Sequence, residues 1–141
     1  MHFDPENPIV KLCAQGMNLE GEGKNDQAFI LFQQAWDQAS NDFEKFTSAH
    51  YVARHQKTIE DKLKWDELAL IAALKINDET MKAFYPSLYL NIAKDHEDLK
   101  DIANAKINYE LALSFSGFLP EDGYGGMIRS GIVSGLVRIQ L

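Results

Sequence analysis

The sequence contains a single cysteine, Cys13, which excludes an internal disulfide and cannot form a zinc site by itself. It also lacks any run of about 18 to 20 apolar residues, the length that crosses a bilayer. The N-terminus, MHFDPENPIV, lacks the basic residues followed by an apolar run that mark a secretory signal. These absences predict a cytoplasmic protein.

Basic residues are also scarce. Lys and Arg total 14 against 21 Asp and Glu, which gives a net charge of −7 and an isoelectric point near 5.0. A chain of this charge is repelled by phosphate backbones and by anionic lipid. We therefore expect neither nucleic acid nor a membrane surface as a partner.

The sequence lacks the motifs that hold cofactors. Its glycine-rich segments, GEGKN and GYGGM, have no preceding strand, so neither predicts a loop that binds ATP, NAD or a nucleotide-like methyl donor. His50 and His55 are five residues apart, which separates them by about 140° around a helix, whereas helical metal ligands are three or four residues apart. We predict no cofactor and no metal.

Signs of catalysis are equally scarce. Cys13 has no nucleophile signature around it, and the acidic pairs lie at breaks between helices, where they favour helix N-termini and solubility. We therefore expect a protein that is not an enzyme.

Helical periodicity is what the sequence does contain. Apolar residues recur every three or four positions from about residue 8 to 115, which predicts an all-α fold, and 141 residues with 45% hydrophobic content fit one domain, 1–141. Turn-forming and capping residues interrupt the pattern at residues 21–25, 41–42, 58–61, 77–78 and 97–101.

Small and aromatic residues repeat at fixed spacing through these helices. The pattern consists of three sets of four residues, and each set begins with a small residue. The second member follows twelve positions later, the third four positions after that, and the fourth, an alanine, another three positions on. The three sets are Gly16, Ala28, Phe32, Ala35; Ala53, Trp65, Ala69, Ala72; and Ala93, Ala105, Tyr109, Ala112. Small residues allow two antiparallel helices to approach closely, so each set predicts one helix hairpin. In the middle set Trp65 and Ala69 exchange large and small side chains, which conserves volume.

This pattern resembles the tetratricopeptide repeat family, most clearly in YLNIAKDHEDLKDIANAKINYELALSF and in GMNLEGEGKNDQAFILFQQAWDQAS. The resemblance covers residues 9–115. It implies three hairpins, at about 8–40, 42–77 and 79–116, in a right-handed stack. A C-terminal helix at about 120–140 would cap the stack, which makes about seven helices. Within that last helix, the Gly131-x-x-x-Gly135 spacing leaves a homodimer interface as an alternative.

The resemblance also implies a concave surface formed by the first helix of each hairpin. Counting from the small residues, it would present Cys13 with Met17, His50 with Arg54, and Leu90 with Lys94. His50, Arg54 and Lys57 have the spacing of one helix face, and Lys94 with Asn91 would continue that face on the next unit. Tyr51 and His55 are expected to pack against the adjacent hairpin.

The predicted surface suits a carboxylate-bearing partner. Its cations would converge without an acidic residue on the central turn, while Met17 would offer apolar contact. We therefore expect a non-catalytic module that binds a peptide or acidic protein segment through His50, Arg54, Lys57, Asn91, Lys94 and Met17. Three alternatives are a merely solvated groove, a small-ligand sensor or enzyme with a pocket at His50, Tyr51 and Arg54, and a homo-oligomeric structural protein that uses the C-terminal helix.

Overall fold

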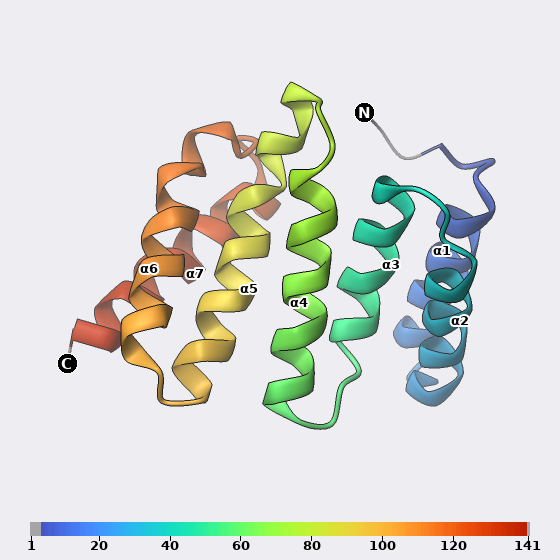
Figure 1. Cartoon of the computed structure of the whole chain (residues 1–141), viewed down its shortest axis with the longest axis horizontal. Helices are drawn as coiled ribbons and strands as arrows, with labels where there is room; N and C mark the ends of the chain where they lie inside the picture. Colours follow the sequence, from blue (N-terminus) through green and yellow to red (C-terminus); the bar gives the residue numbers. More distant parts are fainter. Residues whose placement is uncertain (1–3, 141) are drawn as a thin grey trace. The chain divides into compact units, whose positions relative to one another are not determined.

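The computed structural model describes residues 4–140, and over this range the chain is helical without strands. The described residues form seven α-helices, labelled in Figure 1, and two short 3-10 helices. The α-helices are α1 (Pro8–Gly21), α2 (Asn25–Gln38), α3 (Asp42–Ala53), α4 (Ile59–Leu74), α5 (Tyr85–Asp98), α6 (Ile102–Ser114) and α7 (Gly123–Gln140); the 3-10 helices are η1 (Glu79–Ala83) and η2 (Ser116–Phe118). The predicted all-α class with about seven helices is confirmed. None of the described helices combines the length and apolar character that crossing a membrane requires.

The chain divides into two compact units, the first ending at Ile76 and the second beginning at Asn77. The first holds the helix pairs α1–α2 and α3–α4, and the second holds the pair α5–α6 together with α7. The breaks between the paired helices lie where the turn and capping residues predict them. One detail differs: residues 79–83 form the 3-10 helix η1, so α5 begins at Tyr85 rather than near residue 79. The single domain stays a prediction from length.

Side-chain caps fix where these helices begin. The side chains of Asn7, Asn41 and Thr58 accept hydrogen bonds from backbone N–H groups in the first turns of α1, α3 and α4. Asp101 does the same for α6. Such caps satisfy N–H groups that have no partner inside the helix, and each is worth about 1 kcal/mol.

The core of the first unit is built on close approach at a glycine. A Cβ added to Gly16 of α1 would lie 2.4 Å from Cε1 of Phe32 on α2, so glycine is needed for the fully buried ring to fit. The same ring stacks on Tyr51 of α3, with centroids 5.0 Å apart. Trp65 packs edge-on against Trp36 of α2, also at 5.0 Å. Trp65 thus packs on the neighbouring pair, while Ala69 is fully buried.

The second unit repeats this construction with a tyrosine. Tyr109 of α6 is fully buried beside Ala93 of α5 and Ala105 of α6. A Cβ added to Gly135 of α7 would lie 2.2 Å from its ring, and one added to Gly131 would lie 3.1 Å from Leu90 of α5. Both glycines of the Gly-x-x-x-Gly sequence therefore face into the unit, where they let α7 approach α5 and α6.

Candidate functional site

The cationic stripe predicted on one helix face is not formed, and this part of the prediction is wrong. Helix α3 ends at Ala53, Arg54 is its C-terminal cap, and Lys57 lies in the loop that leads to α4. The physical reason lies in the cap of α4: Thr58 is extended, with φ −116° and ψ 153°, so the chain leaves the helical conformation before it. His50 and Arg54 keep the i, i+4 relation, because Arg54 still has helical dihedral angles, but the relation does not extend to Lys57.

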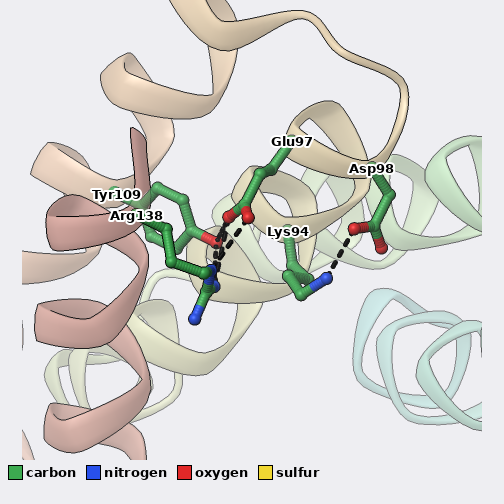
Figure 2. Close-up of polar contacts among 5 residues, drawn as sticks. All are labelled: Lys94, Glu97, Asp98, Tyr109 and Arg138. Atoms are coloured by element: carbon green, nitrogen blue, oxygen red, sulfur yellow. Dashed lines mark hydrogen bonds and ion pairs between the residues drawn. The ribbon is translucent and has the colours of Figure 1, made fainter. Parts of the chain in front are cut away.

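The predicted lack of acidic neighbours is also wrong for two of the three cations. Arg54 Nη2 donates to Glu20 Oε1 at 3.1 Å. Lys94 donates to Asp98, one turn further along α5, as Figure 2 shows. Lys57 is exposed and forms no ion pair within residues 4–140. The contact itself was not predicted, because Glu20 comes from the end of α1, 34 residues away from Arg54 in the sequence.

The six predicted residues belong to both units. Met17, His50, Arg54 and Lys57 lie in the first unit, whereas Asn91 and Lys94 lie on α5 in the second. Asn91 is partly buried, and Lys94 is exposed. The site that can be built from contacts is the one within the first unit.

A cleft between α1 and α3, which we call the α1–α3 cleft, is the strongest candidate in the first unit. Its cavity measures about 180 Å³ and its lining is mainly apolar; the residues are Val10, Cys13, Ala14, Met17, Thr47 and Tyr51. Met17, expected from the sequence to offer apolar contact, is here and half exposed. Tyr51 forms one wall while its ring stacks on Phe32, as its predicted packing on the adjacent hairpin requires.

Thr47 is the lining residue whose buried hydroxyl group has no hydrogen-bond partner among the described residues. Its side chain is buried, with 4% of the residue exposed, and its Oγ1 has no hydrogen-bond partner within residues 4–140. A buried hydroxyl in this state costs about 1 to 3 kcal/mol. Ser48, the next residue, is equally buried but donates to the carbonyl of Glu44 at 2.7 Å. Thr47, a lining residue of the cleft, therefore carries a buried hydroxyl that has no partner in the described part of the chain.

His50 lies between Thr47 and Tyr51 in the sequence, on the same helix. Burial lowers the pKa of its imidazole, and the positive charge of Arg54 contributes to this, although Asp66 opposes it. Its Nδ1 atom is buried and makes no hydrogen bond within the described range. His50 does not line the cavity, so it supports the wall without reaching a ligand there.

A charged group borders the cleft at Tyr51. The guanidinium of Arg54 lies 5.2 Å from the centre of the Tyr51 ring, a cation–π arrangement. Glu20 binds Arg54 with one carboxylate oxygen and lies 2.6 Å from His55 Nε2 with the other. His55 also stacks on Phe32, so it packs on the adjacent hairpin as predicted. These contacts fix Arg54 beside the cleft while leaving its side chain half exposed.

Cys13, the thiol in the cleft, is a wall residue. Burial raises its pKa to about 12, which keeps it protonated at neutral pH. Because the thiolate is the nucleophilic form, this cysteine contributes apolar surface to the cavity.

A second polar cluster, in the second unit, joins three helices (Figure 2). Arg138 of α7 donates to both carboxylate oxygens of Glu97 on α5, at 2.8 and 3.1 Å, and to the hydroxyl of Tyr109 on α6, at 3.2 Å. Tyr109 in turn donates to Glu97 at 2.6 Å. The hydrogen bonds from Arg138 hold the pKa of Glu97 below its usual range, while burial and the Glu97 charge raise the pKa of Tyr109. Each group satisfies another, so the cluster acts as a clamp between helices.

A larger hollow, of about 270 Å³, lies on α4 alone; it is lined by Glu60, Leu63, Lys64, Glu67, Leu68 and Ile71. None of these six residues carries a buried polar atom that lacks a partner. The hollow therefore lacks the feature that distinguishes the α1–α3 cleft. Within residues 4–140, no three His, Cys, Asp or Glu side chains are grouped so that they could hold a metal ion.

In comparisons with known proteins, the chain matches no family model, no curated protein and no solved structure. The geometry of the chain is therefore the basis of the functional argument.

Three residues of the cleft were missed by the sequence reasoning, namely Val10, Ala14 and Thr47. A signal for two of them exists: Val10, Ala14 and Met17 have i, i+4, i+7 spacing, which places them on one face of α1. Thr47 lies four residues before Tyr51, on the same side of α3. Extending the predicted surface by one helical turn would have found it, although not its unpaired hydroxyl.

Proposed function

We propose that this chain is a non-catalytic interaction module that binds a protein segment in the α1–α3 cleft. The bound segment inserts one apolar side chain and places a carboxylate beside it. The observation that carries the proposal is the Thr47 hydroxyl, which is buried without a partner in the wall of an otherwise apolar cavity. Because this oxygen exposes less than 1 Å² in the unbound chain, the wall must shift for a segment to pair with it, and the pairing then recovers a hydrogen bond that the unbound chain does not make.

The size of the cavity favours a side chain as the ligand over a small molecule. Pockets for drug-sized ligands and substrates enclose about 300 to 1,000 Å³, whereas this cavity measures about 180 Å³. A dry cavity of about 150 Å³ accommodates a benzene ring. The cleft thus fits one aromatic or branched aliphatic side chain, the kind of anchor that contributes most of the energy in protein interfaces.

Arg54 accounts for the carboxylate. Its guanidinium carries five N–H donors, and the contact with Glu20 uses Nη2 alone, so donors remain on the half-exposed side chain. Its position over Tyr51 places these donors beside a wall of the cleft. Met17 adds a flexible thioether that adapts its shape to different anchors.

The helix pairs support the same proposal at the level of the fold. Buried alanines and a glycine stand where the tetratricopeptide-like pattern has its small residues, and a cleft between two first helices is where the resemblance implies peptide binding. We extend the proposal to a tetratricopeptide-like right-handed stack in a single domain, and to a cytoplasmic location.

The proposal is tested by selecting random displayed peptides on the immobilised full-length chain. We expect the selected peptides to share an aromatic or branched residue close to Asp or Glu. Ala14→Trp fills the cleft from an exposed position of α1 and should weaken binding at least tenfold. Ala103→Trp, the same change at an exposed position of α6, should leave binding unchanged.

The carboxylate contact needs its own variant. Arg54→Met keeps the long apolar stem over Tyr51 but removes the charge, so it should weaken acidic peptides and abolish the salt dependence of their affinity. Peptides that bind the wild type and Ala14→Trp equally well would reject the cleft as the site. Equal binding to wild type and Arg54→Met would reject the carboxylate contact alone.

A further inference from the structure

The last three helices of the chain repeat the first three. Glu20 of α1 binds Arg54, the C-terminal cap of α3, and Glu97 of α5 binds Arg138 of α7. In both pairs the glutamate side chain is 16% exposed and the arginine 45%. A buried ring follows each glutamate by twelve residues, Phe32 in the first unit and Tyr109 in the second. By these contacts α7 is the counterpart of α3.

This correspondence fixes the register between α7 and α3. With Arg138 matched to Arg54, Gly135 matches Tyr51, and each of these two residues contacts the buried ring of its own unit. Val133 and Val137 then match Ala49 and Ala53. At about 100° per residue, both pairs point about 160 to 200° away from the side that contacts the ring.

That opposite side is covered in α3 and bare in α7. In the first unit α4 packs on α3, and Ala49 and Ala53 are 0% and 1% exposed. In the second unit Val133 and Val137 are 55% and 54% exposed. By its contacts, α7 has the position of a hairpin's first helix, and no second helix covers it within residues 4–140.

The bare side of α7 is free of charge. It consists of Met127, Ser130, Val133, Ser134 and Val137, which we call the α7 outer face. The two arginines of the helix flank this face and are paired within the unit, Arg138 with Glu97 and Arg129 with backbone carbonyls and Glu121. Gly131 and Gly135 face inward, so the two glycines of the Gly-x-x-x-Gly sequence are not part of the α7 outer face.

We propose that the α7 outer face binds the same face of a second copy of this chain, with the two α7 helices antiparallel. Four of its five residues, Met127, Ser130, Ser134 and Val137, are placed symmetrically about position 132. In an antiparallel pair centred there, Met127 meets Val137 of the other copy and Ser130 meets Ser134, with Val133 close to the two-fold axis. Such a self-complementary face is what an interface with two-fold symmetry requires.

Charge supports a second copy as the occupant. Each chain carries −7 and repels its like over most of its surface. The outer face has no charged residue, so two copies can meet there without a direct like-charge contact. Small serines at its centre allow the helix axes to approach closely, as Ala49 and Ala53 do under α4.

The size of the contact sets the expected strength. One helix face buries less than the roughly 1,200 to 2,000 Å² of a standard stable interface. The dimer should therefore be weak, with a dissociation constant on the order of 10 to 100 μM, and its population should depend on concentration.

Sedimentation of the full chain over a concentration series tests this proposal. We expect a reversible monomer–dimer equilibrium for the wild type and loss of the dimer, by at least tenfold in affinity, for Val133→Glu. Ile107→Glu is the matched control, since Ile107 is 54% exposed on α6, and it should dimerise like the wild type. A wild type that stays monomeric at millimolar concentration, or a dimer that Val133→Glu leaves intact, would overturn the proposal.

Cross-linking tests the antiparallel register independently. Ser130→Cys mixed with Ser134→Cys should give a disulfide-linked heterodimer faster than either variant gives a homodimer, because residue 130 of one copy faces residue 134 of the other. The buried Cys13 should not interfere. Equal rates for the mixture and for the single variants would reject this register.

Discussion

Arg138 on α7 and Glu97 on α5 form a bidentate ion pair, with N–O distances of 2.8 and 3.1 Å. Glu20 forms the corresponding pair with Arg54 through a single hydrogen bond. In each unit, an acidic residue near the end of one helix, α1 or α5, thus binds an arginine at α3 or α7, two helices further along the chain. The Glu97–Arg138 pair should therefore contribute measurably to the free energy of unfolding.

The Glu97–Arg138 pair predicts an acid-dependent loss of stability. Because the pKa of Glu97 is lowered in the folded chain, its stabilisation is complete above its unfolded value, about 4.3, and is lost as the pH falls below that through the folded value. At neutral pH, Glu97→Gln should lower the free energy of unfolding by about 1 kcal/mol, a modest value because Arg138 is half exposed. Urea unfolding at pH 7 and at pH 3 measures both effects.

The matched control is Glu110→Gln. Glu110 lies 3.9 Å from Lys106, and both side chains are exposed, so this change should alter stability very little at either pH. For Glu97→Gln, the difference from wild type should shrink at pH 3. A difference that is the same at both pH values would show that Glu97 contributes by packing instead of charge.

Gly135 should tolerate no larger residue. The Cβ of Gly135→Ala would lie 2.2 Å from the Tyr109 ring, so α7 or the ring must move, at a cost of about 1 to 3 kcal/mol. Gly21→Ala, at the end of α1 with no atom within 4 Å of the new Cβ, should be neutral or slightly stabilising. Thermal unfolding compares the two variants, and equal melting temperatures would contradict the packing of α7 described above.

The Thr47 hydroxyl should lower the stability of the unbound chain and strengthen peptide binding. Thr47→Val replaces a buried hydroxyl that has no partner, so we expect unfolding to cost about 1 kcal/mol more, while the selected peptides bind more weakly. Ser48→Ala, which removes a hydroxyl bonded to Glu44, should instead lower stability. If Thr47→Val destabilised the chain as Ser48→Ala does, the hydroxyl would have a partner and the cleft would lose its main argument.

Cys13 should resist thiol reagents in the folded chain. Burial and a pKa of about 12 keep the thiol protonated and inaccessible at pH 8. We expect Ellman's reagent to react with it slowly in native buffer and stoichiometrically in denaturant. Fast reaction under native conditions would place the thiol at an open surface.

The sequence predicted the helices because their signals are local. Caps such as Asn41 and Thr58, and the small residues at fixed spacing, act within one turn or one hairpin, and the structure places helix boundaries and buried alanines accordingly. The unpredicted η1 has a local cause too: Asp78 accepts a hydrogen bond from Thr80 N, which starts a tight 3-10 turn.

The site was predicted less well because it depends on contacts distant in sequence. Met17 lies in the cleft as expected, but the end of α3 at Ala53 removed Lys57 from the helix face. Glu20 at the end of α1 contacts Arg54 at the end of α3, and spacing within one helix does not reveal such a contact. The unpaired hydroxyl of Thr47 is likewise a property of the packed chain alone.

A methyl and amide NMR titration of the full chain with a selected acidic peptide tests most directly whether the α1–α3 cleft binds a protein segment. We expect shifts concentrated on the cleft residues Val10, Ala14, Met17 and Thr47, absent in Ala14→Trp and preserved in Ala103→Trp. Shifts confined to the α4 hollow or to the α7 outer face, with the cleft unchanged, would contradict it.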